Sequence, residues 1–179
     1  RCALSHYQFE TIHPFQDGNG RIGRLLITLY LVSNNLLTKP SLYLSSYLDK
    51  HRGTYYDSLT RVRESNDIGH WVRFFLQAVA ETADKGKETF HHLLTLRNEV
   101  DRKVVRLGRR AENARKLIMH LYGKPSVNVN EVVNLLGIQY YSANQLVASL
   151  VDCGILQETT GQQRNRYFMF GDYLRIFQD

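Results

Sequence analysis

The sequence predicts a mainly α protein, on three observations. Only three prolines occur in 179 residues, at Pro14, Pro40 and Pro125, so little in the chain opposes long helices. Apolar residues recur mostly at three- and four-residue spacing, which is the period of an amphipathic helix. The alternating pattern of a strand appears only in two short segments near the C-terminus. With 43% hydrophobic and 22% charged residues, the chain is typical of a soluble globular protein of one ordinary domain or two small ones.

The first part of the chain carries three helical patterns. We expect a first helix from about Gly20 to Asn34, with Pro40 closing the turn that follows it. Its buried face would consist of Ile22, Leu25, Leu26 and Leu29. A second helix is expected from about Ser46 to Arg63. Asn66 or Asp67 can cap a third, which continues to about Leu107 as a long connecting helix. The core face of this third helix would comprise Trp71, Phe74, Phe75, Ala78 and Val79.

The pattern changes to shorter elements near Gly108. We therefore expect one domain over residues 1–108, which includes the long connecting helix, and a second over residues 109–179. Its three short helices are expected at about Ala111 to Leu121, Glu131 to Leu136 and Ser142 to Asp152. Two strand-like segments follow, Ile155 to Glu158 and Arg166 to Phe170, joined by a tip at Thr159 to Asn165. With Gly137 in the turn between the second and third helices, this is the pattern of a winged helix-turn-helix with a small β-hairpin.

A winged helix raises the alternative of a DNA-binding regulator, and the distribution of charged residues helps to decide between the two functions. The 23 Lys and Arg against 17 Asp and Glu give a net +6, but residues 109–179 hold 8 basic and 6 acidic residues, a net of +2. The expected recognition helix offers uncharged groups, namely Gln139, Tyr140, Tyr141, Ser142, Asn144 and Gln145. Because phosphate contacts dominate affinity for DNA, DNA binding is the less favoured interpretation, although Arg164 and Arg166 keep it open. Otherwise the module would serve packing, homodimer formation or docking of a target protein.

Residues 12–24 combine a histidine, a carboxylate, a Gly-Asn-Gly turn and two arginines just before the first expected helix. Gly18 and Gly20 let the backbone turn tightly and bring N–H groups close to a ligand, while the helix adds the positive end of its dipole. Asn19 adds a side-chain amide donor. Arg21 and Arg24, three residues apart, leave the helix on one face and can clamp further phosphate oxygens. The combination predicts a phosphate-binding nest.

A candidate base and a candidate metal ligand accompany this nest. His13 is the expected general base for deprotonating an attacking hydroxyl, because an imidazole can exchange a proton near neutral pH. Asp17 is a hard oxygen ligand suited to Mg²⁺, which bridges phosphates and needs few protein ligands. Phe15 is expected to anchor the loop to the core. The chemistry that follows is in-line attack on a nucleotide phosphate, with a metal, amides and arginines stabilising the phosphoryl oxygens.

These residues resemble the signature of the Fic (Fic/Doc) domain family, HxFx(D/E)GNGRxxR. Its specified positions are all matched, by His13, Phe15, Asp17, Gly18, Asn19, Gly20, Arg21 and Arg24. The resemblance continues through residues 43–48, 55–59 and 71–76, and the tail resembles the winged-helix domain attached to one Fic subgroup. It implies a Fic-type helical core, of which this chain holds the C-terminal portion, followed by a winged helix.

The resemblance implies a protein adenylyltransferase, with ATP as co-substrate and Mg²⁺ held by Asp17. His13 would deprotonate a Ser, Thr or Tyr hydroxyl of a target protein, which attacks the α-phosphate of ATP, forms an AMP-protein ester and releases pyrophosphate. The implied nucleotide contacts are Gly18, Asn19, Gly20, Arg21, Arg24, Tyr55 and Tyr56. The glycines and the asparagine would form the anion hole, the arginines would contact the outer phosphates, and one of the two tyrosines would pack near the adenine.

The resemblance also leaves alternatives. Relatives use this site for phosphotransfer, for UMP transfer or for removal of AMP from a modified target. Many carry an inhibitory helix with an (S/T)xxxE(G/N) motif whose Glu pairs with the residue matching Arg24. That motif does not occur in this sequence, so inhibition would come from an upstream helix or from a separate partner. The chain begins at Arg1 rather than Met, so we expect the N-terminal part of the Fic fold to be missing, which leaves the activity of this portion alone open.

Composition indicates a cytoplasmic protein without a membrane anchor in these residues. Charged residues interrupt each apolar run well short of the ~18 residues that a membrane helix needs, and no basic-then-apolar leader opens the chain. The two cysteines, Cys2 and Cys153, lie at opposite ends without metal-ligand spacing. They therefore support neither a disulfide scaffold nor a zinc site, and a reducing compartment is expected.

Overall fold

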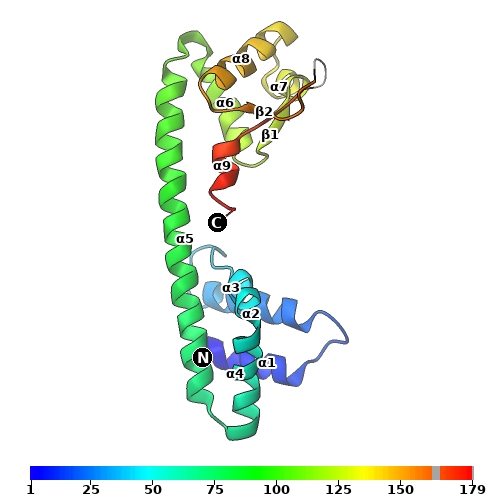
Figure 1. The fold of residues 1–179 in the computed structure, drawn as a ribbon, viewed down its shortest axis with the longest axis vertical. Coiled ribbons are helices and arrows are strands. Elements are labelled where there is room, and N and C mark those ends of the chain that lie inside the picture. The colour runs from blue at the N-terminus through cyan, green and yellow to red at the C-terminus, as the bar shows by residue number, and fades with distance from the viewer. Residues whose placement is uncertain (163–165, 179) are drawn as a thin grey trace. The chain divides into compact units, whose positions relative to one another are not determined.

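A computed structural model describes residues 1–162 and 166–178 of the chain. The protein is mainly α, as the sequence predicts, with one small antiparallel sheet. The chain divides into two compact units, Arg1–Glu88 and Thr89–Asp179. This division lies inside the long helix α5 (Ile68–Val105), which Figure 1 shows as uninterrupted. The domain boundary expected after residue 108 stays a prediction, because it marks where the long helix ends rather than where packing changes.

The first unit is a cluster of helices built on one aromatic core. Its elements are α1 (Cys2–Ile12), α2 (Asn19–Ser33), α3 (Ser45–Lys50), α4 (Arg52–Ser65) and the first part of α5. Trp71 of α5 is fully buried, and its indole N–H donates to the carbonyl of Ala3, 2.8 Å away. Phe74, Phe75 and Ala78 are buried with it, as their helical spacing predicted. The bond from Trp71 therefore attaches α1 to the core of the unit.

Helix α1 is an element that the sequence analysis missed. Its buried side chains are Ala3, His6 and Glu10, whereas Leu4 and Ile12 are exposed. The face that packs inward is thus small or polar, and the apolar residues do not form the single stripe by which an amphipathic helix is recognised. Hydrophobic periodicity had no signal to detect here.

The predicted buried face of α2 is wrong for three of its four residues. Leu25, Leu26 and Leu29 are exposed, at 56%, 38% and 52%, and Ile22 is half-buried. The buried positions are instead Asn19, Gly23, Ile27 and Thr28. Helix α2 packs on α1 through this smaller face, because a glycine there allows close approach of the two helices. Two of the leucines, Leu26 and Leu29, line an apolar groove of about 440 Å³ beside α1.

The single helix expected over residues 46–63 is two helices. They meet at His51, whose φ of −106° and ψ of 34° leave the helical region, so α3 ends there and α4 begins. Asn66 closes α4 in the left-handed conformation, with φ of 55°. Of the two caps predicted for the long helix, Asp67 is the one used: its carboxylate accepts from the backbone N–H of His70 at 3.1 Å.

The second unit packs the last part of α5 on a small α/β module. Its core is lined by Leu96, Val100 and Val104 of α5 together with apolar residues of every other major element. The elements are a 3₁₀ turn (Gly108–Arg110), α6 (Ala111–Leu121), β1 (Ser126–Asn128), α7 (Val129–Leu136), α8 (Tyr140–Asp152), β2 (Gln157–Glu158), β3 (Tyr167–Met169) and α9 (Gly171–Arg175). The strands lie in the order β1-β3-β2 with antiparallel pairing.

Local signals explain most of this module. Asn128 and Glu131 form a reciprocal capping box at the start of α7, and Gly137 ends that helix with φ of 63°. Helices α6, α7 and α8 and strands β2 and β3 occur where they were predicted, whereas β1 and α9 were not. Their order along the chain is that of a winged helix, which stays a prediction. The expected hairpin tip includes residues 163–165, which lie outside the described residues. Within the described part of the chain, none of the helices has the length and apolar character to cross a membrane.

Candidate functional site

The site lies at the corner between α1 and α2. His13 ends α1 as its C-cap, in the left-handed conformation with φ of 50° and ψ of 57°, and its N–H donates to the carbonyl of Phe9 at 2.9 Å. This conformation is uncommon for a residue with a side chain, and histidine is among the types that tolerate it best. It turns the chain sharply, so the exposed imidazole of His13 faces the loop that leads into α2.

Asn19 holds that loop in place. It is almost fully buried, its Oδ1 accepts from the backbone N–H of Phe15 at 2.9 Å, and its Nδ2 donates to the carbonyl of the same residue at 2.6 Å. The side chain thus fastens the loop, and its expected role as an amide donor to phosphate stays a prediction. The ring of Phe15 is 48% exposed and lies against Phe9, so the expected anchoring of the loop to the core by this ring is wrong.

Two arginines fold back over the glycines at the start of α2. A Cβ on Gly18 would meet the guanidinium of Arg21 at 3.4 Å, and one on Gly20 would meet that of Arg24 at 3.9 Å. Gly18 itself has φ of 81°, which favours glycine. Side chains on a helix lean toward its N-terminus, so both guanidinium groups collect at the positive end of the α2 dipole. Like charges are gathered there, which is the arrangement that an anion stabilises.

Each arginine has a carboxylate partner. Arg21 lies 3.7 Å from Asp17 and Arg24 lies 3.7 Å from Asp49 of α3. The other oxygen of Asp17 accepts from the N–H of Gly18 at 2.7 Å. In the described residues, no group of three or more His, Cys, Asp or Glu could hold a metal ion. Asp17 is nonetheless a highly exposed hard oxygen ligand, and Mg²⁺ takes most of its ligands from phosphates and water, so the residue fits a single-carboxylate site.

The corner forms one wall of a cavity of about 370 Å³, and the α3–α4 junction forms the other. The first wall is lined by His13, Gln16, Asp17, Gly18, Asn19, Gly20, Arg21 and Arg24, and the second by Leu48, Asp49, Arg52, Tyr55 and Tyr56. The structure thus brings together every residue that the sequence analysis assigned to the site. It also adds Asp49 and Arg52, which carried no motif; only the position of Arg52 one helical turn before Tyr56 could have indicated it.

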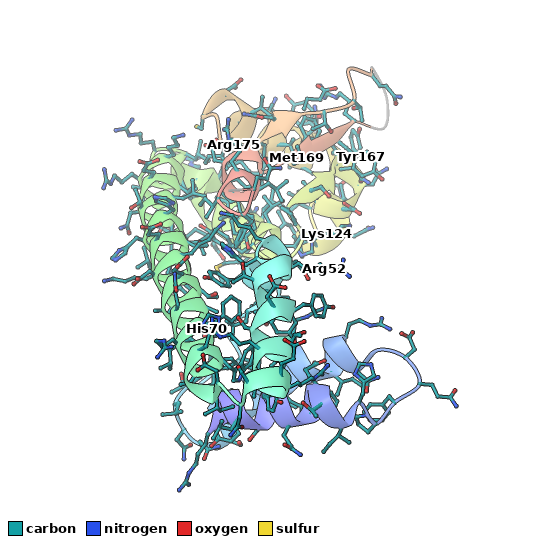
Figure 2. The ribbon with its side chains drawn as sticks, turned by 60° about the horizontal axis from the view of Figure 1, so that its bottom comes forward. Arg52, His70, Lys124, Tyr167, Met169 and Arg175 are labelled. Carbon is teal, nitrogen blue, oxygen red and sulfur yellow. The ribbon has the colours of Figure 1, made fainter. Side chains whose placement is uncertain are left out.

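The two tyrosines differ in what they offer a ligand. Tyr56 is 52% exposed, and the guanidinium of Arg52 lies 5.7 Å from its ring centroid. Figure 2 labels Arg52 in the first turn of α4. Tyr55 is buried, and its hydroxyl lies 3.0 Å from Nε2 of His6. The placement of one of them near adenine stays a prediction, and the accessible ring is that of Tyr56.

His6 ties Tyr55 to α2. Its Nδ1 lies 2.9 Å from the carbonyl of Gly23, which can only accept, so Nδ1 carries the proton and Nε2 accepts from the hydroxyl of Tyr55. Burial lowers the pKa of His6 to about 4, which keeps the ring neutral as this pattern requires. Burial likewise raises the pKa of Tyr55. The three residues fix α1, α2 and α4 to one another behind the cavity.

Comparison with known proteins agrees with the geometry. The profile of the Fic/DOC family matches residues 1–31, which span α1, the loop and most of α2. This part of the chain is thus similar to the Fic/DOC family. The protein adenylyltransferase Fic of Aedes aegypti is 39% identical over 83 residues, which are 46% of this chain and 15% of that protein. A probable protein adenylyltransferase of Aquifex aeolicus (strain VF5) is 62% identical over 37 residues, 21% of this chain and 12% of that protein.

The Fic/DOC match covers a limited part of each protein. The chain spans about 15% of the length of the Aedes aegypti relative, and the same share holds for the Culex quinquefasciatus relative, also 39% identical over 83 residues. The residues matched by the family profile lie in the unit that holds the cavity. What these whole proteins do is therefore carried to this chain only as a proposal.

Proposed function

We propose that this protein transfers AMP from ATP to a hydroxyl of a target protein. The observation that carries the proposal is the cavity in which the imidazole of His13 meets the N-terminus of α2 and two arginines. A base beside a polyphosphate site is what such a transfer needs. The names of the Fic/DOC relatives, which are protein adenylyltransferases, support it.

The roles of the residues follow from their chemistry. His13 accepts the proton of the target hydroxyl as its oxygen forms a bond to the α-phosphorus of ATP. The bond between the α-phosphorus and the bridging oxygen then breaks, and pyrophosphate leaves with its electron pair. The N–H groups at the start of α2 and the guanidinium groups of Arg21 and Arg24 offset negative charge on the phosphate oxygens. Mg²⁺, when bound by Asp17, would neutralise further phosphate charge.

The second wall would hold the nucleoside. The accessible ring of Tyr56 offers a face for stacking of the base, with the guanidinium of Arg52 beside it. Tyr55 supports this wall from behind through its bond to His6. We therefore assign the base contact to Tyr56 rather than to Tyr55.

Transfer of label tests the proposal directly. Protein that contains this chain is incubated with cell lysate, Mg²⁺ and ATP labelled at the α-phosphate, beside the same protein carrying His13→Ala. Label that enters a protein band only with intact His13 and Mg²⁺ supports AMP transfer and gives the mass of the target. Transfer of label from γ-labelled ATP instead would assign phosphotransfer to the site. Release of AMP from a target that was modified beforehand, without labelling from ATP, would assign hydrolytic removal of AMP to the site.

A second candidate function, binding of DNA by the C-terminal unit, is favoured by one observation. Helix α8 carries no Lys or Arg of its own, yet Arg110 donates to Ser149 at 2.8 Å and to Gln145 at 2.7 Å. Arg166 donates to Asn144 at 3.2 Å. Cations from the 3₁₀ turn before α6 and from the residue before β3 thus lie on the polar face of α8, and of these two the sequence alone indicated only Arg166.

Salt dependence tests this second function. Affinity for duplex DNA, measured by fluorescence anisotropy between 50 and 200 mM salt (about a fourfold range), should fall steeply if phosphates are contacted. Arg110→Gln should weaken binding and flatten that dependence. Affinity that is undetectable, or that does not change with salt, would leave α8 as a packing or docking surface.

A further inference from the structure

Asp49 places a negative charge inside the cavity that we assign to a polyphosphate. It lies at the end of α3, and its side chain is 66% exposed. Among the residues that line the second wall it is the acidic one, and the other polar side chains there come from Arg52 and two tyrosines. Nothing in the chemistry of phosphate binding calls for a carboxylate at this place, so its presence needs an explanation.

Its partner is one of the two arginines of the first wall. Oδ1 of Asp49 lies 3.7 Å from Nη1 of Arg24, whose side chain is only 25% exposed. The pairing of Arg21 with Asp17 is local, across four residues of one loop and helix, and both of those side chains are well exposed. The pairing of Arg24 with Asp49 joins two walls of the cavity, and screening by solvent is weaker at the less exposed guanidinium.

A phosphate oxygen at Arg24 would bring its negative charge close to Asp49. The two anions repel each other at such distances, and the same N–H group of the guanidinium can make a close contact with only one of them. Phosphate binding at Arg24 therefore requires that the carboxylate of Asp49 move away. Its high exposure, 66% of the side chain, makes this movement easy.

We propose that Asp49 is the counter-ion of Arg24 in the free protein and that a nucleotide polyphosphate displaces it. Asp49 is then a specificity-determining residue, because it weakens the binding of ligands whose phosphates reach Arg24 and has no effect on the nucleoside. This inference rests on the proposed function in that it takes the cavity to be the nucleotide site.

The test compares Asp49→Asn with a matched control. Asparagine keeps the shape of the side chain and removes its charge. Asp57→Asn removes a charge that is also exposed, from the neighbouring helix α4, at a position that does not line the cavity. Isothermal titration with ATP should show about two- to fivefold tighter binding for Asp49→Asn and unchanged binding for Asp57→Asn. Binding of adenosine, followed by ligand-observed NMR, should be the same in all three proteins.

Arg24 supplies the decisive second variant. If Asp49 acts through Arg24, then adding Asp49→Asn to Arg24→Gln should change ATP affinity by less than it does in the unmodified chain. An equal gain in both backgrounds, an equal gain from Asp57→Asn, or weaker ATP binding by Asp49→Asn would each overturn the inference.

The binding data also separate this inference from the proposed function. ATP binding without transfer of α-label would refute the function and leave the role of Asp49 standing on the titrations. Transfer of label with no effect of Asp49→Asn on ATP affinity would support the proposed function and refute the role of Asp49. Absence of ATP binding in every variant would overturn both.

Discussion

The carboxylate of Glu10 lies directly against Gly23, so that a Cβ at position 23 would collide with Oε1 of Glu10. Glu10 belongs to α1 and Gly23 to α2, the two helices that meet at the candidate site. Oε1 of Glu10 is buried and has no hydrogen-bond partner among the described residues, and burial raises the pKa of this carboxyl. The contact thus fixes how closely the helix that ends at His13 approaches the helix that carries the arginines.

Gly23→Ala should therefore destabilise the first unit, by about 1–3 kcal/mol, because the added methyl overpacks the contact. Adding Glu10→Ala should recover part of that loss, since it removes the group that collides. Urea unfolding followed by the fluorescence of Trp71, the single tryptophan, reports this unit. Gly86→Ala is the matched control: a Cβ there meets nothing within 4 Å, and alanine favours a helix. Additive losses in the double variant would contradict the contact.

Stability of the first unit should fall as pH falls from about 6.5 to about 4. His6 is neutral in the folded state, with its pKa lowered to about 4 by burial, whereas in the unfolded chain it titrates near 6.5. Between these two pKa values the unfolded state binds more protons than the folded state. The contribution of neutral His6 to stability is therefore fully present above pH 6.5 and is lost as the pH falls toward 4. The loss would be on the order of 3 kcal/mol.

Glu10 opposes this trend, because a carboxyl with a raised pKa in the folded state favours folding at lower pH. The measurement is urea unfolding across pH 4 to 7 for the unmodified chain, for His6→Gln and for Glu10→Gln. His6→Gln should flatten the acid loss, and Glu10→Gln should steepen it. An unchanged pH profile in His6→Gln would show that other groups titrate in this window.

The sequence predicted the buried face of the long helix α5 well, and it predicted the buried faces of α1 and α2 poorly. The spacing of Trp71 and Phe75 identified the core face of α5, because large apolar residues recur there at helical period. In α1 the buried positions are filled by His6 and Glu10, whose burial depends on partners from α2 and α4. The leucines of α2, such as Leu25, are exposed for a similar reason. The face of α2 that packs on α1 is determined by the close approach at Gly23 and not by the hydrophobicity of its residues.

The part of the candidate site that comes from one continuous segment of the chain could be predicted from the sequence. Apart from Gln16, the residues that line the first wall were all assigned to the site from the sequence, because the turn and the helix start depend on local glycine chemistry. The second wall could be suggested only through the resemblance of the sequence to a family, and Asp49 was missed altogether. Its place in the cavity results from the break between α3 and α4 at His51, where the sequence pattern indicated one continuous helix.

Asn19→Ala should disorder the loop that carries the candidate base and metal ligand. The variant loses two hydrogen bonds to the backbone of Phe15, at a buried position where the amide cannot be replaced by solvent. We expect a loss of about 1–3 kcal/mol in stability and a strong loss of AMP transfer. Hydrogen exchange at the amide of Phe15 should accelerate far more than at amides of α4. Unchanged exchange at Phe15, with transfer lost, would instead indicate that Asn19 contacts the nucleotide.

Tyr55 and Tyr56 should separate stability from nucleotide binding. Tyr55→Phe removes the hydroxyl that donates to His6 and leaves a buried nitrogen unsatisfied, so we expect a loss of about 1–3 kcal/mol in stability with ATP affinity nearly unchanged. Tyr56→Ala removes an exposed ring and should leave stability within about 0.5 kcal/mol, while ATP affinity falls about tenfold as base stacking is lost. Tyr56→Phe keeps the ring and should retain most of that affinity. Urea unfolding and ATP titration of the three variants give both quantities, and a Tyr55→Phe variant that is stable but fails to bind ATP would place the base on the inner tyrosine.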